Sequence, residues 1–268
     1  TTIVSSATSG TYTTSASQVA GTYTRYRISV TDTLDAISAY VTSNIVKKNS
    51  PPNAPIIDCP QSGNSTYNVK PRFMIIMGTE PDGQTQILEV KIDAGVWLNS
   101  VDNPELFSTN GYLINGVKTV FQAPTLTAGN HTVTFRSLDS DVRSQSTEIV
   151  RTFTVLASPF ETITANVTHV KAEHMKAIRN AVNTARNYYC LPSNTWNEEI
   201  TAGKTTIKDW PFHVMEIRRA LVPIMTKING FDANSSAFDL PSDDWQPIGT
   251  GRPEADVMQQ LHIIVFLL

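Results

Sequence analysis

The sequence predicts a multidomain β + α protein, with strands up to residue 157 and helices after it. Three observations carry this prediction. Before residue 157, apolar and polar residues alternate with a period of two, which is typical of strands with one buried face. After residue 158, apolar residues recur at spacings of three and four, which is typical of amphipathic helices. The proline-rich segment NSPPNAP, residues 49–55, predicts a short stiff linker.

Residues 1–49 are predicted to form short strands. In YTRYRISVTD, Tyr26, Ile28 and Val30 alternate with Arg27 and Ser29 before an Asp-containing turn. This pattern resembles the end of a fibronectin type III domain, and the resemblance covers only its final strands. An isolated pair of strands is marginally stable in water. We therefore expect residues 1–49 to be the C-terminal part of such a domain, completed by upstream sequence or by another chain.

Residues 50–157 are predicted to form one complete β-sandwich. ILEVKID places Leu88, Val90 and Ile92 on one face, and HTVTFRSLD places Val133 and Phe135 in the same way. Pairs such as Asp-Gly and Asn-Gly mark the turns between these runs. About seven short strands in roughly 100 residues are typical of immunoglobulin-like domains. The order of segments resembles the Ig-like repeats of bacteria and phages.

Residues 158–268 are predicted to form a small bundle of three helices. Separate apolar stripes run from Met175 to Tyr189, from Val214 to Ile228, and from Val257 to Leu268. Helices of this length are marginal alone, so we expect the three stripes to be buried only against one another.

The helical segment contains an internal repeat. FETITANVTHVKAEHMKAIRNA aligns with WNEEITAGKTTIKDWPFHVMEIRRA, and WQPIGTGRPEADVMQQL is a degenerate third copy. The residues that define the repeat are Ile163, Asn166, His174, Arg179, Trp196, Ile200, Gly203, His213, Arg218, Trp245 and Gly251. Gly203-Lys204-Thr205 matches the end of a phosphate-binding loop, but Glu198 stands where that motif needs its first glycine. We interpret Gly203 as a turn residue of the repeat.

The recurring His and Arg residues allow two interpretations. His174 and His213 could form a metal or carboxylate site between helices, or each could hydrogen-bond a neighbouring loop. Arg179 and Arg218 could bind an anionic sugar or phosphate, or tie each helix to the loop before it. The structural interpretation is favoured for both pairs, because a position that recurs in a scaffold is usually part of the scaffold.

Other candidate chemistry is sparse. Trp97 could stack on a sugar, although a packed position at a sheet edge is the favoured interpretation. Asp82, Asp139 and Asp141 could bind Ca²⁺, but turn formation is the favoured interpretation, because acidic residues in turns are far more often turn formers. The two cysteines, Cys59 and Cys190, are expected to be unpaired. We find no catalytic motif and predict no enzyme activity, no cofactor and no metal.

Charge and hydropathy narrow the range of partners. The net charge is −3. The sequence contains no run of basic residues of the kind that would predict binding to nucleic acid. The longest apolar run, IIVFLL, is far shorter than the roughly 20 residues that a membrane-spanning helix needs. We therefore expect neither nucleic-acid binding nor membrane insertion.

The repeat pattern resembles a helical module of fibronectin- and Ig-bearing proteins from Gram-positive bacteria and their phages, over roughly residues 54–268. This resemblance implies an extracellular structural and attachment protein of a phage virion, associated with a tail fibre or baseplate. Its partners would be other virion proteins or copies of itself in a homo-oligomer, with a host-surface glycan as a further partner. The alternatives are a bacterial adhesin, a carbohydrate-binding module, or an accessory region of a secreted glycan-degrading enzyme.

Overall fold

The computed structural model describes residues 49–141, 143–158, 172–201 and 210–231, together with four two-residue strands between residues 23 and 47. These short strands are β1 (Tyr23–Thr24), β2 (Arg27–Ile28), β3 (Val41–Thr42) and β4 (Val46–Lys47). β1 pairs with β4 and β2 pairs with β3, both antiparallel. The prediction that residues 1–49 are the C-terminal part of a fibronectin type III-like domain lies largely outside the described residues and stays a prediction.

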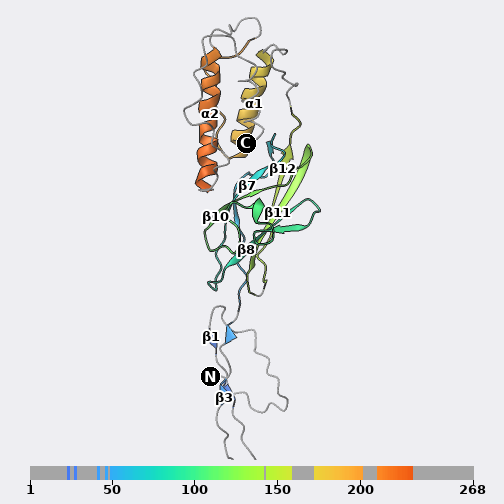
Figure 1. Cartoon of the computed structure of the whole chain (residues 1–268), viewed down its shortest axis with the longest axis vertical. Coiled ribbons are helices and arrows are strands. Elements are labelled where there is room, and N and C mark those ends of the chain that lie inside the picture. The colour runs from blue at the N-terminus through green and yellow to red at the C-terminus, as the bar shows by residue number, and fades with distance from the viewer. Residues whose placement is uncertain are drawn as a thin grey trace, which may run out of the picture.

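The central part of the chain is a sandwich of two β-sheets (Figure 1). One sheet has the strand order β10-β7-β5, and the other has the order β6-β12-β11-β8-β9. The strands are β5 (Ile56–Cys59), β6 (Asn64–Thr66), β7 (Arg72–Ile76), β8 (Gln86–Ile92), β9 (Trp97–Asn99), β10 (Lys118–Gln122), β11 (Gly129–Asp139) and β12 (Ile149–Val155), with one 3₁₀ turn at Pro104–Leu106. The predicted β-sandwich is therefore confirmed.

The strand order is that of an immunoglobulin-like domain. β11 lies between β12 and β8, while β5, β7 and β10 form the facing sheet. All pairings within the sandwich are antiparallel except that of β6 with β12. Aromatic side chains fill the space between the sheets: the ring of Phe73 lies 5.2 Å from that of Phe153 and 5.5 Å from that of Phe135. The alternation read from the sequence thus places the apolar faces inward.

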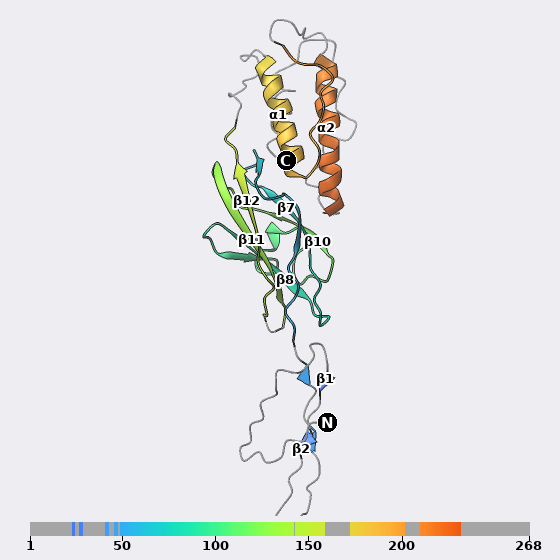
Figure 2. The ribbon, with the colours of Figure 1, turned by 180° about the vertical axis from the view of Figure 1, so that it is seen from behind.

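Two helices, α1 (Ala172–Tyr188) and α2 (Trp210–Phe231), stand side by side at one end of the sandwich (Figures 1 and 2). α2 begins where the sequence places a proline in the first turn, at Pro211. The third predicted helix, and the repeat residues Ile163, Asn166, Gly203, Trp245 and Gly251, lie outside the described residues. The three-helix bundle built from repeats therefore stays a prediction.

The expectation that the helices bury their stripes only against one another is wrong. Cys59, Met74 and Val120 of the sandwich belong to the same buried cluster as the apolar stripes of α1 and α2. The rings of Phe73, in the sandwich core, and Tyr188, at the end of α1, lie 6.5 Å apart. Two amphipathic helices leave apolar surface exposed at their ends, and the open end of the sandwich covers it. The helical pair and the sandwich therefore share a continuous core.

Candidate functional site on the outer face of the five-stranded sheet

The face of the five-stranded sheet that points away from the sandwich core carries a group of polar side chains. On β11, Val133 and Phe135 are completely buried, so Thr132, Thr134 and Arg136 point to the opposite side. The register with the neighbouring strands extends this face, pairing Thr132 with a threonine of β12 and Arg136 with a glutamate of β8. Two features stand out on it: a polar pocket and a tryptophan covered by cations.

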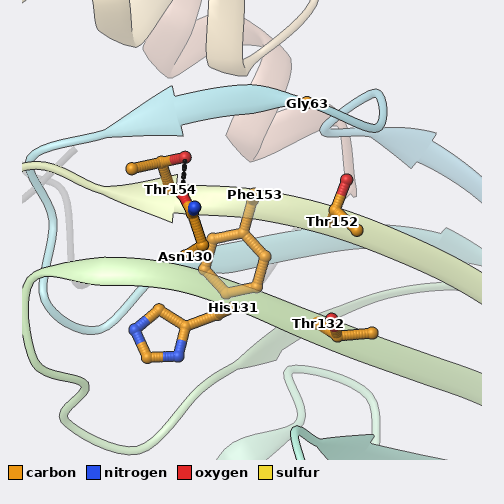
Figure 3. Close-up of a pocket in the computed structure, with 7 residues that line it drawn as sticks. All are labelled: Gly63, Asn130, His131, Thr132, Thr152, Phe153 and Thr154. Carbon is orange, nitrogen blue, oxygen red and sulfur yellow. Dashed lines mark hydrogen bonds between the residues drawn. The ribbon is translucent and has the colours of Figure 1, made fainter.

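The pocket lies where β6, β11 and β12 meet and has a volume of about 340 Å³. Figure 3 shows the side chains from β11 and β12, with the turn before β6 above them. Its lining residues are Gly63, Asn130, His131, Thr132, Thr152, Phe153 and Thr154. Sequence reasoning missed this pocket, because the segments 130–132 and 152–154 that line it are ordinary strand sequence until the sheet register brings them together.

Gly63 forms one wall of the pocket. Its backbone N–H donates to the carbonyl oxygen of Thr152 at 2.7 Å. Its φ of +87° lies in the left-handed region, which residues with a Cβ rarely adopt. A Cβ built at this position would meet no atom within 4 Å, so the space beside Gly63 is open. The turn conformation thus favours glycine, and with glycine at this position no side chain projects from this wall into the pocket.

Hydrogen bonds orient the polar groups of the pocket. The Thr154 hydroxyl donates to Asn130 Oδ1 at 2.8 Å, the bond that is dashed in Figure 3, so Nδ2 is the remaining polar group of this amide. The hydroxyls of Ser62 and Thr152 lie 3.0 Å apart and share a hydrogen bond. The pocket therefore presents an amide donor and several hydroxyl groups in fixed positions.

One ion pair lies beside the pocket. His131 Nδ1 is 2.8 Å from Asp93 Oδ2, and Nε2 is 2.9 Å from the carbonyl oxygen of Thr127. Both neighbours accept hydrogen bonds, so the doubly protonated imidazolium satisfies both ring nitrogens. The Thr132 N–H donates to the other oxygen of Asp93 at 2.8 Å. The pair has no net charge, and its hydrogen bonds to Thr127 and Thr132 fix the loop that leads into β11.

The pKa values of the pair follow from this geometry. Burial lowers the pKa of His131, but the hydrogen bonds to Asp93 and Thr127 outweigh burial and hold that pKa above its ordinary value. Burial raises the pKa of Asp93, but the hydrogen bonds from His131 and Thr132 outweigh it, so that pKa lies below its ordinary value. Both shifts favour the charged forms together.

Trp97 lies at the other end of the same face, on the edge strand β9. Its half-buried ring carries the guanidinium of Arg136 at 3.8 Å and the ammonium of Lys91 at 4.6 Å from its centroid. Arg136 is held there by Glu89 Oε2 at 2.7 Å and by Gln145 Oε1 at 2.7 Å. Trp97 thus serves as a packing platform for two cations. Its role as a glycan contact stays a prediction.

In the helical pair, Arg179 is the centre of a buried network. Its guanidinium donates to Glu216 Oε2 at 2.7 Å, to His213 Nδ1 at 3.0 Å and to the carbonyl oxygen of Glu198 at 2.6 Å, and stacks at 4.9 Å on Trp196. The sequence predicted that each arginine ties its helix to the loop before it. Among the described residues, Arg179 reaches the loop and the helix that follow it, because the first helix packs against the second repeat. The loop before α1 lies outside the described residues, so the predicted tie to that loop stays a prediction.

The other described repeat residues lie nearby. His174 and Ile200 are buried, and Arg218 is half-buried on α2. Loss of solvent lowers the pKa of Arg218. Within the described residues, no group of three His, Cys, Asp or Glu side chains is placed to hold a metal ion.

The acidic turn residues Asp82 and Asp139 fix the linker to the sandwich. Asp82 accepts a hydrogen bond from the Ser50 N–H at 2.5 Å. Asp139, which is completely buried, accepts from Asn49 Nδ2 and from the Ser144 hydroxyl, at 2.5 and 2.6 Å. Asn53 adds a backbone hydrogen bond to Thr79 at 2.9 Å. The linker residues 49–53 are therefore bound to the domain that follows them, a role that turn propensity alone did not indicate.

The expectation of two unpaired cysteines is wrong. Cys59, at the end of β5, forms a disulfide with Cys190, just after α1, with their Cα atoms 6.0 Å apart. Lys227 of α2 lies beside this bond, with Nζ 3.1 Å from Asp58 Oδ2 and 3.2 Å from Cys59 Sγ. The partners are 131 residues apart in sequence, so no local pattern could pair them. The bond links the helical pair covalently to the sandwich.

Comparisons with known proteins add no identity. No family model and no curated protein matches the chain. The PKD domain of an M14-like peptidase from Thermoplasmatales archaeon SCGC AB-540-F20 is 18% identical over 41% of this chain and 99% of its own, with a TM-score of 0.31. Domains d3–d4 of rat CD45 are 10% identical over 57% and 74%, with a TM-score of 0.28. The chicken interferon gamma receptor alpha chain is 10% identical over 50% and 66%, with a TM-score of 0.25. At these scores no argument rests on the likeness, and the immunoglobulin-like assignment rests on the strand order. No helix in the described residues has the length and apolar character needed to cross a membrane.

Proposed function

We propose that the chain is a structural and attachment protein of a phage virion, associated with a tail fibre or baseplate. In this proposal the sandwich is a stiff bead between the N-terminal β segment and the helical pair. The observation that carries it is the way in which the sandwich is fixed at both ends. The link to phages that infect Gram-positive gut bacteria rests on the resemblance of the repeat module alone.

Both junctions have the properties that a load-transmitting rod needs. At one end, Asn49 and Ser50 are hydrogen-bonded to buried or half-buried carboxylates of the sandwich. At the other end, the Cys59–Cys190 disulfide and a shared apolar core hold the helical pair. Linked domains move relative to one another unless their interface is large and apolar. A bead fixed in this way can carry a binding surface at a defined orientation.

The disulfide also supports an extracellular location for the protein. Disulfides persist in secreted and surface-exposed proteins and are rare in the reducing cytosol. A protein that works outside the cell keeps the Cys59–Cys190 bond and so keeps its helical pair attached. This reasoning applies equally to a virion protein and to a bacterial surface protein.

Mass spectrometry of purified particles tests the assignment. We expect peptides of this chain in phage particles banded by density, and gold-labelled antibodies against residues 50–157 at the tail. Peptides found only in the bacterial envelope fraction would overturn the virion assignment and favour a bacterial adhesin. Light scattering of the purified chain tests the proposed homo-oligomer, with a monomer at all concentrations as the contrary result.

A further inference from the structure

We propose that the pocket between Gly63, β11 and β12 binds a neutral saccharide unit of a surface glycan. This inference rests on the attachment function proposed above and names its ligand class and its site. Four of its polar side chains, from Asn130, Thr132, Thr152 and Thr154, come from the outer face of the sheet, and none of its lining residues belongs to the disulfide or to the linker hydrogen bonds. Its features point to a small, uncharged ligand rich in hydroxyl groups.

The first argument is the supply of polar groups. Asn130 Nδ2 and Thr132 Oγ1 have no hydrogen-bond partner among the described residues, while Asn130 Oδ1 is occupied by the Thr154 hydroxyl. The pocket thus offers an amide N–H₂ donor, the Thr132 hydroxyl, which can donate and accept, and the Thr154 hydroxyl, which can still accept. Sugar hydroxyls need this combination, because each one donates one hydrogen bond and accepts others.

The second argument is charge. The charged residue that lines the pocket is His131, and its imidazolium is paired with Asp93 at 2.8 Å. Its other ring nitrogen is bound to the Thr127 carbonyl at 2.9 Å, so no N–H of this ring is left for a ligand. An anionic ligand would find no unpaired cation in the pocket, and a cationic ligand would find no unpaired carboxylate. The balance favours a neutral ligand.

The third argument is size. The volume of about 340 Å³ lies at the lower end of the range of about 300–1,000 Å³ that is typical of small-molecule sites. The wall at Gly63 has open space where a side chain would stand. A saccharide unit at the end of a chain can therefore enter while the rest of the glycan stays in solvent.

The helical pair sets the position of the pocket wall. Asn64, next to Gly63, donates from Nδ2 to the carbonyl oxygen of Asn187 on α1 at 2.8 Å. The Gly63–Asn64 turn is thus held between β12 and the docked helix. Fixed polar groups lose less entropy when a ligand binds, so a docked helical pair favours binding.

The test uses the full chain and an immobilised array of neutral di- and trisaccharides built from glucose, galactose, rhamnose and N-acetylglucosamine, with glucuronate-bearing versions alongside. The variant Asn130→Ala/Thr132→Val removes the two available donors. Val150→Thr is the matched control, because Val150 is exposed on the same strand face but lies outside the pocket. Thermal melts of both variants establish that they are folded.

We expect the wild type and Val150→Thr to bind the same neutral glycans, and the double variant to lose at least about tenfold in affinity, as the loss of one or two hydrogen bonds predicts. Equal binding by the double variant would place the glycan elsewhere and overturn the inference. Preference for glucuronate-bearing versions would overturn the charge argument. Binding to no array member would overturn the saccharide site, while detection of the chain in particles would still uphold the virion assignment.

Discussion

Removing the disulfide between Cys59 and Cys190 is the sharpest test of how the helical pair is held. The perturbation is the double variant Cys59→Ala/Cys190→Ala. The bond closes a loop of 131 residues, and the loop-entropy relation for disulfides converts a loop of that length into about 5 kcal/mol of stability at 25 °C. Residual structure in the unfolded chain reduces this value, so it is an upper figure.

A second contribution comes from packing. Cys59 is completely buried in the core that the sandwich shares with the helices. Truncation to alanine removes one sulfur atom there, at a cost of about 1 kcal/mol. Lys227 Nζ, 3.2 Å from Cys59 Sγ, keeps its carboxylate partner Asp58 in the variant. The cross-link therefore dominates the expected loss.

Urea unfolding, followed by circular dichroism at a helical wavelength, measures the effect. We expect the free energy of unfolding of the double variant to fall by about 3–6 kcal/mol, and the m-value to rise because the unfolded chain loses a constraint. Reductant should bring the wild type close to the variant and leave the variant itself unchanged. Two titratable thiols in the native, non-reduced chain, or no response of the wild type to reductant, would refute the reasoning.

Three further predictions concern single sites. Arg179→Met leaves the buried Glu216 carboxylate without its guanidinium partner, so we expect a loss of about 3–5 kcal/mol in urea unfolding, largely recovered when Glu216 is also changed to leucine. The ion pair of His131 and Asp93 should stabilise the fold most between about pH 4 and pH 6.5: the contribution of His131 is lost as pH rises through its raised pKa, and that of Asp93 is lost as pH falls through its lowered pKa. The melting-temperature difference between wild type and His131→Gln should therefore be largest near pH 5, and a difference that is larger at pH 9 would contradict this assignment. Gly63→Ala should cost about 1–2 kcal/mol because φ is +87°, and an unchanged melting temperature would count against the turn conformation.

Much of the sandwich could be predicted because the alternation of apolar and polar residues that marks a strand lies within a few neighbouring residues. The alternation of Val133 and Phe135 with polar neighbours on β11 follows from the geometry of a single strand, and one buried face was enough to identify it. The apolar stripes of α1 and α2 were equally visible, as was the proline at the start of α2.

The site could not be predicted in the same way, because each of its parts joins distant segments. The pocket needs Asn130 and Thr154 side by side, which depends on the register of β11 with β12. The contacts of Arg179 with Glu198, His213 and Glu216 were not predicted, since repeat alignment shows equivalent positions but not which copies touch. Asp139 was assigned to turn formation, and its partner Asn49 lies 90 residues away.

Within the described residues, the sequence by itself determined which segments are strands and helices, which faces are apolar, and that the chain has a proline-rich junction. Only the tertiary structure decided that Cys59 pairs with Cys190, that the helices share the core of the sandwich, and that a neutral polar pocket opens beside Gly63. The physical reason is the range of the interactions. Periodicity and backbone preference act over a few neighbouring residues, whereas a disulfide, a shared core and a pocket depend on the packing of segments that are far apart in the chain.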